Sequence, residues 1–124
     1  MDNKIKIVEI FQNNLNDFFE TLIEQYPQET DLVLVKTFFN HFCSPVEIIE
    51  YFCKNLLTVE VKQMLEKEDE KFFLQNNSLF SDIKNQQKVF HFKTLWKSSN
   101  SQQKVMIWQW IKKFKRIAEL YKNQ

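Results

Sequence analysis

The chain has 124 residues, with 17 basic and 16 acidic side chains, a formal net charge of +1, two cysteines and no glycine. This length suits one domain rather than two, so we expect a single domain over residues 1–124. Average composition would supply about nine glycines. Their absence excludes phosphate-cradling loops, dinucleotide-binding turns and strained nucleophile elbows, because each of these needs backbone without a Cβ atom.

Two helices are predicted in the first third of the chain. Apolar residues recur at spacings of three and four over residues 3–25, which is typical of an amphipathic helix. Pro27 lacks an amide hydrogen and disfavours helical dihedrals at the residue before it, so this helix should end near Tyr26. A second helix is predicted to start after Thr30 and to run through Phe42, although the β-branched residues of DLVLVKTFF also suit a short strand.

The clearest local signal is formed by Ser44, Pro45 and Glu47. A serine hydroxyl can accept from the amide three residues on, proline fits the first helical position, and the glutamate can bond back to the serine amide. A third helix should therefore begin here. It should end near Leu57, so that Thr58 caps a fourth helix.

The middle of the chain is less regular. Residues 66–71, EKEDEK, indicate a solvated turn or helix surface, and residues 72–74 indicate a short buried segment. Residues 75–87 are polar and turn-like, so we expect irregular structure there. Residues 89–99 should bury aromatic side chains, either in an extended segment or in a helical turn.

The last helix is predicted over residues 100–122, because Ser99 and Gln102 have the spacing of a capping box. An apolar stripe runs along it, with Val105 and Trp108 alongside: Ile107, Ile111, Phe114, Ile117, Ala118 and Tyr121. Together these elements predict an all-α, single-domain bundle of five to seven helices.

The small net charge hides a division along the chain. Residues 1–83 carry 7 basic and 15 acidic side chains, whereas residues 84–124 carry 10 basic side chains and only one acidic side chain. Such a division indicates either an acidic body with a basic contact surface or a fold that pairs the two parts internally.

The start of the chain and its cysteines bear on location. The opening MDNKIKIVEIF lacks the apolar segment and cleavage site of a secretory signal. The apolar runs are far shorter than the roughly 20 residues that cross a bilayer. We therefore expect a cytoplasmic or nuclear protein with reduced Cys43 and Cys53 and no membrane partner.

Five phrases occur in this order: EQYP, SPVEIIEYF, KEDEKFF, FHFKTLW and IWQWIKKFKRIAEL. The order resembles a set of small uncharacterised helical proteins from nucleocytoplasmic large DNA viruses. Those proteins share an acidic, phenylalanine-rich segment, a Leu-Trp pair and a final helix that opens on Ile-Trp, matched here by residues 69–73, 95–96 and 107–108. Trp110 stands where the resemblance would place a tyrosine. The resemblance implies a virus-encoded role in an infected cell and brings no catalytic residues.

Metal binding and catalysis are not expected. His41, Cys43, Cys53 and His91 are the residue types that bind zinc, but their spacing matches no zinc motif. We interpret the two cysteines as small hydrophobic residues. No glycine flanks either cysteine, and the paired carboxylates of the chain lie in the solvated run EKEDEK. We therefore predict no metal, no cofactor and no enzymatic activity.

Binding to another macromolecule is the function that we expect. An aromatic share of 15% should leave rings outside so small a core. Trp108 and Trp110 lie about 200° apart around a helix, so both can hardly face one core. Trp108 lies nearer the apolar stripe, which leaves Trp110 to contact another protein or a second copy, with Lys113 as a polar rim. Packing of Trp110 against a neighbouring helix of the same domain is the open alternative.

Sequence-nonspecific binding of nucleic acid is the second hypothesis. Basic and aromatic residues alternate in the C-terminal region, residues 84–122, as they do on surfaces that bind nucleic acid. The use of lysine rather than arginine disfavours bidentate recognition of bases or phosphates. The candidate contacts are Lys97, Lys104, Lys112, Lys113, Lys115 and Arg116.

Overall fold

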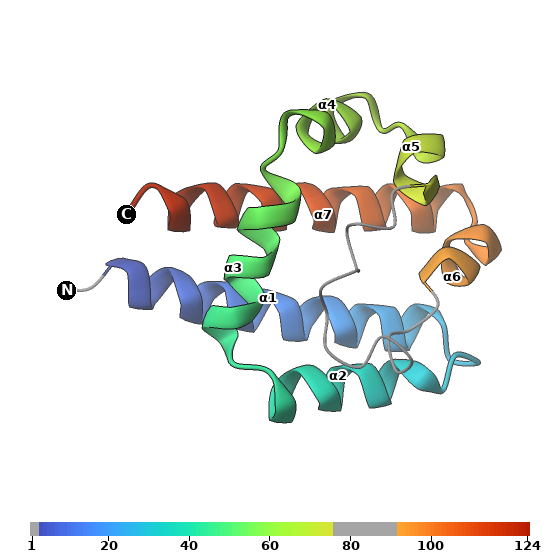
Figure 1. Ribbon diagram of the computed structural model, residues 1–124. Helices are drawn as coiled ribbons and strands as arrows, with labels where there is room; N and C mark the ends of the chain where they lie inside the picture. Colours follow the sequence, from blue (N-terminus) through green and yellow to red (C-terminus); the bar gives the residue numbers. More distant parts are fainter. Residues whose placement is uncertain (1–2, 76–91) are drawn as a thin grey trace.

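The computed structural model describes residues 3–75 and 92–124, without the side chains of residues 42, 73–75 and 92–94. This part of the chain holds seven helices and no strand, which confirms the predicted all-α class (Figure 1). The helices are α1 (Asn3–Gln25), α2 (Asp31–Phe42), α3 (Pro45–Leu56), α4 (Val59–Lys67), α5 (Glu70–Gln75), α6 (Phe92–Ser98) and α7 (Ser101–Lys122).

The two long helices, α1 and α7, lie side by side and antiparallel, and α3 crosses both of them (Figure 1). α2 packs against α1, and α4 packs against α7. The ammonium group of Lys4 lies 4.7 Å from the centre of the Tyr121 ring, so the start of α1 contacts the end of α7. At the other end of the pair, the side-chain amide of Gln103 donates to the carbonyl of Gln25.

The predicted helix boundaries are largely confirmed. The Ser44 hydroxyl accepts from the amide of Glu47 at 3.1 Å, directly before α3. The Thr58 hydroxyl accepts from the amide of Val61 at 3.3 Å, directly before α4. Residues 31–42 are helical, so the strand alternative was wrong. The helical alternative for residues 89–99 holds from Phe92 onward, while most of the predicted irregular stretch lies outside the described residues.

The cap of the last helix differs from the prediction by one residue. Asn100, not Ser99, is the N-cap: its Oδ1 accepts from the amide of Gln103 at 2.8 Å, and Gln103 Oε1 accepts from the amide of Asn100 at 2.9 Å. Ser99 instead follows α6, and its hydroxyl donates to the carbonyl of Leu95 and pairs with the hydroxyl of Tyr26. A hydroxyl held in this way is not available to α7, so the next residue takes the capping role.

We expect Asn100→Ala to lower the free energy of unfolding by about 1 kcal/mol, because the amide of Gln103 loses the side-chain oxygen that accepts its hydrogen bond at the start of α7. Ser101→Ala, at the exposed first residue of the helix, is the matched control and should change stability by less than about 0.5 kcal/mol. Urea denaturation followed by circular dichroism measures both. Equal losses in the two variants would contradict the assignment of the cap.

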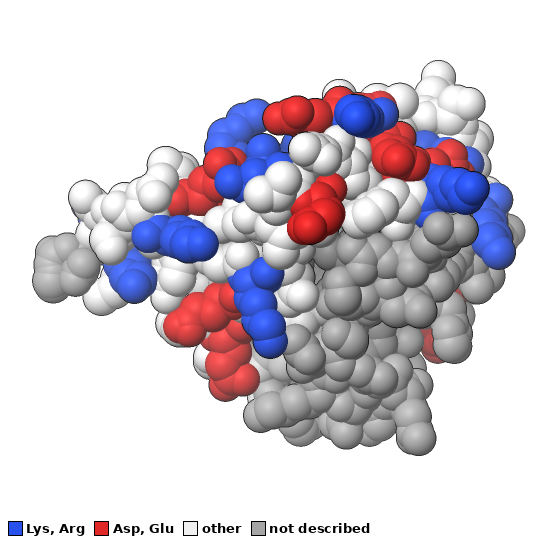
Figure 2. Space-filling model, turned by 45° about the horizontal axis from the view of Figure 1, so that its top comes forward, with Lys and Arg blue, Asp and Glu red and all other residues white. Residues whose placement is uncertain are grey.

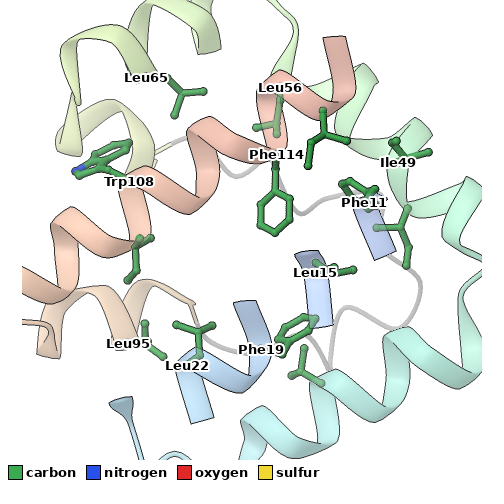
Figure 3. Close-up of a cluster of buried hydrophobic side chains, with 14 of the residues drawn as sticks. Phe11, Leu15, Phe19, Leu22, Ile49, Leu56, Leu65, Leu95, Trp108 and Phe114 are labelled. Carbon is green, nitrogen blue, oxygen red and sulfur yellow. The ribbon is translucent and has the colours of Figure 1, made fainter. Parts of the chain in front are cut away.

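The core is centred on a trio of rings that joins three helices. Phe11 of α1 and Phe114 of α7 have ring centroids 5.6 Å apart, and Phe52 of α3 lies 5.2 Å from Phe11 and 5.6 Å from Phe114. Figure 3 shows Phe11 and Phe114 pointing into the same interior from opposite helices. α3 therefore covers the seam between α1 and α7 on one side of that pair.

The described aromatic side chains are all buried or half-buried, so the expectation of rings left outside was wrong for this part of the chain. The large exposed apolar side chains are aliphatic: Ile5, Ile10, Val33, Leu34, Val46, Val59, Val105 and Leu120. Val105 is 53% exposed and so does not join the apolar stripe of α7, whereas Trp108 does. Because α1, α3 and α4 all pack against α7, the core can bury more aromatic side chains than the single apolar stripe of α7 would predict.

Candidate interaction surface

Trp110 lies at the edge of the aromatic core, half-buried on α7. Its ring is 5.5 Å from that of Phe18 on α1 and is stacked at 5.8 Å on Phe114. The ammonium group of Lys113 lies 5.0 Å from the centre of the same indole. The structure thus brings the two predicted interface residues together, while one side of Trp110 packs against a neighbouring helix of the domain.

Trp108 points into the interior, as its place beside the apolar stripe predicts. It is 5% exposed, and its ring meets that of Trp96 edge-on at 5.1 Å. Trp96 is fully buried, and its indole N–H donates to Glu70 Oε1 at 2.7 Å. A buried indole requires an acceptor for its only polar hydrogen. The sequence held both halves of this contact, 26 residues apart, but no local pattern connects them.

Acidic side chains directly after α4 and at the start of α5 meet basic side chains of α7. Lys104 Nζ lies 3.0 Å from Glu70 Oε1 and also 5.5 Å from the centre of the Trp96 ring. Lys112 Nζ lies 2.7 Å from Glu68 Oε2. Figure 2 shows side chains of both signs next to one another over this face. Of the two interpretations of the divided charge, internal pairing is what these contacts support.

The position of Glu68 depends on an unusual backbone conformation. It follows α4 with φ 51° and ψ 51°, the only positive φ angle among the described residues. Helices often end in this left-handed conformation, normally at a glycine, and the amide of Glu68 donates to the carbonyl of Leu65. A chain without glycine places a longer side chain there, and in this case that side chain reaches Lys112.

The six candidate contacts for nucleic acid divide into two groups. Lys104 pairs with Glu70 and Lys112 pairs with Glu68, while Lys115 lies 3.7 Å from Glu119 on its own helix. The second group makes no ion pair with any residue that the structure describes and is exposed: Lys97, Lys113 and Arg116. Lys97 lies on α6, at the opposite end of α7 from Arg116. The free cations therefore do not gather in one patch.

The carboxyl group of Glu70 is held in its charged form. The hydrogen bond from the Trp96 indole, and next the contact with Lys104, lower the pKa of Glu70 below its ordinary value. When folding lowers the pKa of a carboxyl group, its charged form stabilises the folded state at pH values above the pKa of the unfolded chain. This stabilisation is lost as the pH falls through the pKa of the folded chain.

We therefore expect Glu70→Gln to be less stable than the wild-type chain at neutral pH, with a difference that narrows as the pH falls below about 4, the ordinary range of glutamate. Glu66→Gln, at an exposed residue of the same acidic segment, is the control and should follow the wild-type profile. Thermal melts from pH 7 to pH 3 supply the comparison. A difference in melting temperature between Glu70→Gln and the wild-type chain that stays constant from pH 7 to pH 3 would contradict the stabilising role of the charged Glu70 carboxylate.

Cys53 is half-buried on α3 and contacts α7. The Cys53 thiol donates to the carbonyl of Ala118 at 3.4 Å, and burial raises the pKa of Cys53. A raised thiol pKa opposes formation of the nucleophilic thiolate. His91, part of the zinc set considered above, lies outside the described residues. Within residues 3–75 and 92–124, no three or more His, Cys, Asp or Glu side chains are grouped so that they could hold a metal ion.

Comparison with family models, with curated proteins and with solved structures finds no match to this chain. The resemblance to proteins of large DNA viruses accordingly stays a prediction. Among the described residues, no single helix is long and apolar enough to span a membrane. The segments Asp31–His41 and Pro45–Leu56, whose axes are bent by 108° relative to each other, reach the required length and hydropathy only when they are counted together.

Proposed function

We propose that the protein is a non-enzymatic interaction module that binds another protein or a second copy of itself through the exposed side of α7. The observation that carries this proposal is the pairing of half-buried Trp110 with Lys113 at the surface end of the aromatic core. An indole anchored by Phe18 and Phe114 is already ordered, so a partner that covers it gains apolar contact at little cost in side-chain entropy. The lysine supplies a polar rim around this contact.

Nucleic-acid binding is the alternative function, and the ion pairs argue against it. Before Lys104 or Lys112 could bind a phosphate, it would have to leave the carboxylate of Glu70 or Glu68. Those carboxylates would also repel a polyanion that approached α7. Of the six candidate contacts, only Lys97, Lys113 and Arg116 make no ion pair with a described residue, and three cations are few for an affinity that depends on the number of neutralised phosphates.

The proposal is tested by quantitative capture with the immobilised full chain. The resemblance to viral proteins supports a role in the cytosol or nucleus of an infected cell, so the lysate should come from the cell in which the chain is made. We expect the wild-type chain to retain one protein in stoichiometric amount. The Trp110→Ala variant should no longer retain it, whereas the Leu34→Ala variant, changed at an exposed residue of α2, should still retain it. Equal retention by both variants would contradict the proposed surface.

A gel mobility shift with unrelated DNA and RNA separates the two functions. We expect no shift with the wild-type chain at low or moderate salt. A shift at low salt that disappears steeply as salt rises, and that Arg116→Gln weakens, would overturn the protein-binding proposal in favour of the alternative.

A further inference from the structure

Two carboxylates from one short stretch of chain lie on lysines of α7. Glu68 Oε2 is 2.7 Å from Lys112 Nζ, and Glu70 Oε1 is 3.0 Å from Lys104 Nζ. We name residues 68–70 the acidic triplet. The two lysines are eight positions apart on α7, which is about 12 Å along its axis at about 1.5 Å per residue. The triplet thus neutralises two successive cations of one helix.

The backbone of the acidic triplet holds both carboxylates in place. The side chain of Asp69 accepts from the amide of Phe72 at 3.1 Å and so caps α5. Glu68 has the left-handed conformation, which disfavours side chains with a Cβ atom and which asparagine tolerates better than glutamate. The end of α4 therefore does not explain a glutamate at this position, whereas the contact with Lys112 does.

These ion pairs block a surface more effectively than they stabilise the fold. Their four side chains are between 30% and 47% exposed. Exposed ion pairs contribute little to stability, because water screens them and because ordering two long side chains costs entropy. A carboxylate in direct contact with an ammonium group nevertheless cancels the attraction of that group for any other anion.

The face around these pairs is neutral only because of the two carboxylates. Residues 66–71, EKEDEK, supply two lysines and four acidic side chains, and the two lysines of α7 raise the number of lysines to four. Figure 2 shows the two signs mixed over this face. Lys67 and Lys71 are exposed and form no ion pair with any residue that the structure describes. Without the charges of the two carboxylates, these side chains would have a net charge of +2, four basic against two acidic.

We propose that Glu68 and Glu70 form an autoinhibitory contact: their carboxylates occupy Lys104 and Lys112, which bind the phosphates of a nucleic-acid duplex once those carboxylates are removed. An ammonium group binds phosphate as a point charge, so lysine suits contacts that do not depend on base sequence. One strand of a duplex carries a phosphate about every 3.4 Å of its axis, so about three or four phosphates span the two lysines.

A duplex fits this face better than a single strand does. Binding of unpaired bases relies on aromatic side chains on which the bases stack, and the described rings are buried or half-buried. A duplex has the higher charge density and needs only cations. The inference goes beyond the proposed function, because Trp110 lies at least about 120° around α7 from either lysine.

The test is fluorescence anisotropy with a short labelled DNA duplex of mixed sequence, at about 0.05 M and about 0.2 M NaCl. We expect no binding by the wild-type chain. We expect Glu68→Gln with Glu70→Gln to bind, at least about tenfold more tightly than Glu9→Gln with Glu24→Gln. That control makes the same change in net charge at exposed residues of α1. Glutamine keeps an oxygen that can accept from the Trp96 indole, so the variant should fold, and circular dichroism checks this.

Two further variants identify the cations and protect the test against misfolding. Adding Lys104→Gln and Lys112→Gln to the variant without both carboxylates should weaken binding at least about tenfold. The slope of log K against log salt should fall by about 1.8, because each phosphate contact on a duplex contributes about 0.9. Glu68→Gln alone leaves the contact between Glu70 and Trp96 intact and should give part of the gain in affinity.

Three results would overturn the autoinhibitory contact. The first is equal affinity of the variant without both carboxylates and of the α1 control, which is an effect of net charge alone. The second is binding that survives the loss of both lysines, and the third is no gain from Glu68→Gln. All three leave the proposed function in place, because capture of a protein through Trp110 is measured separately. Binding of the duplex by the wild-type chain would contradict both proposals.

Discussion

Phe114→Ala is expected to lower the free energy of unfolding by about 3 to 5 kcal/mol, a large part of the stability of a domain of this size. Phe114 is 3% exposed, and its ring lies between 5.5 and 5.8 Å from four others. These four rings come from three helices: Phe11, Phe18, Phe52 and Trp110. Truncation removes buried apolar area and leaves a cavity where α1, α3 and α7 meet.

Phe114→Leu is the matched control, because leucine keeps most of the apolar volume but not the ring geometry. We expect it to cost less than about half as much as the alanine variant. Urea denaturation with a shared slope would measure both losses. A loss below about 1 kcal/mol for Phe114→Ala would mean that the ring cluster does not join the three helices as described.

Trp108→Ala and Trp110→Ala should differ strongly, although the two residues are separated by one position. Trp108 is 5% exposed against fully buried Trp96, so its truncation should cost about 3 to 5 kcal/mol. Trp110 is half-buried and packs with one side on Phe18 and Phe114, so its truncation should cost about 1 to 2 kcal/mol. Its contact with α1 is the reason that the cost is not zero.

Chemical denaturation of the two variants, with tryptophan fluorescence and circular dichroism as separate probes, supplies the comparison. The Trp110 variant should keep the cooperative transition and lose the captured partner, whereas the Trp108 variant should unfold at a much lower denaturant concentration. Equal destabilisation by both would contradict the assignment of Trp110 to the interaction surface, since a residue needed for stability to that extent belongs to the core.

Several elements of the fold could be predicted from short stretches of sequence. Pro27 ends α1, Ser44 with Pro45 begins α3, and Thr58 begins α4, as the patterns indicate. Each of these signals acts over three or four residues, because a cap or a proline affects only the backbone groups next to it. The all-α class follows from the same local patterns and from the helical spacing of apolar residues.

The pairing of acidic and basic side chains depends on contacts that local patterns do not contain. Glu70 meets Trp96 and Lys104 across 26 and 34 residues of sequence, and Glu68 meets Lys112 across 44. Sequence showed an acidic part and a basic part, but not which carboxylate reaches which ammonium group.

By itself, then, the sequence determined where α1 ends, where α3 and α4 begin and that the helices carry apolar stripes, since these properties depend on neighbouring residues. Only the tertiary structure decided that Ser99 serves α6 and Asn100 caps α7, that Trp110 lies half-buried at the surface, and which cations remain without a carboxylate. The physical reason is that burial and ion pairing depend on which helix lies opposite, and the packing of α1, α3 and α4 around α7 sets that.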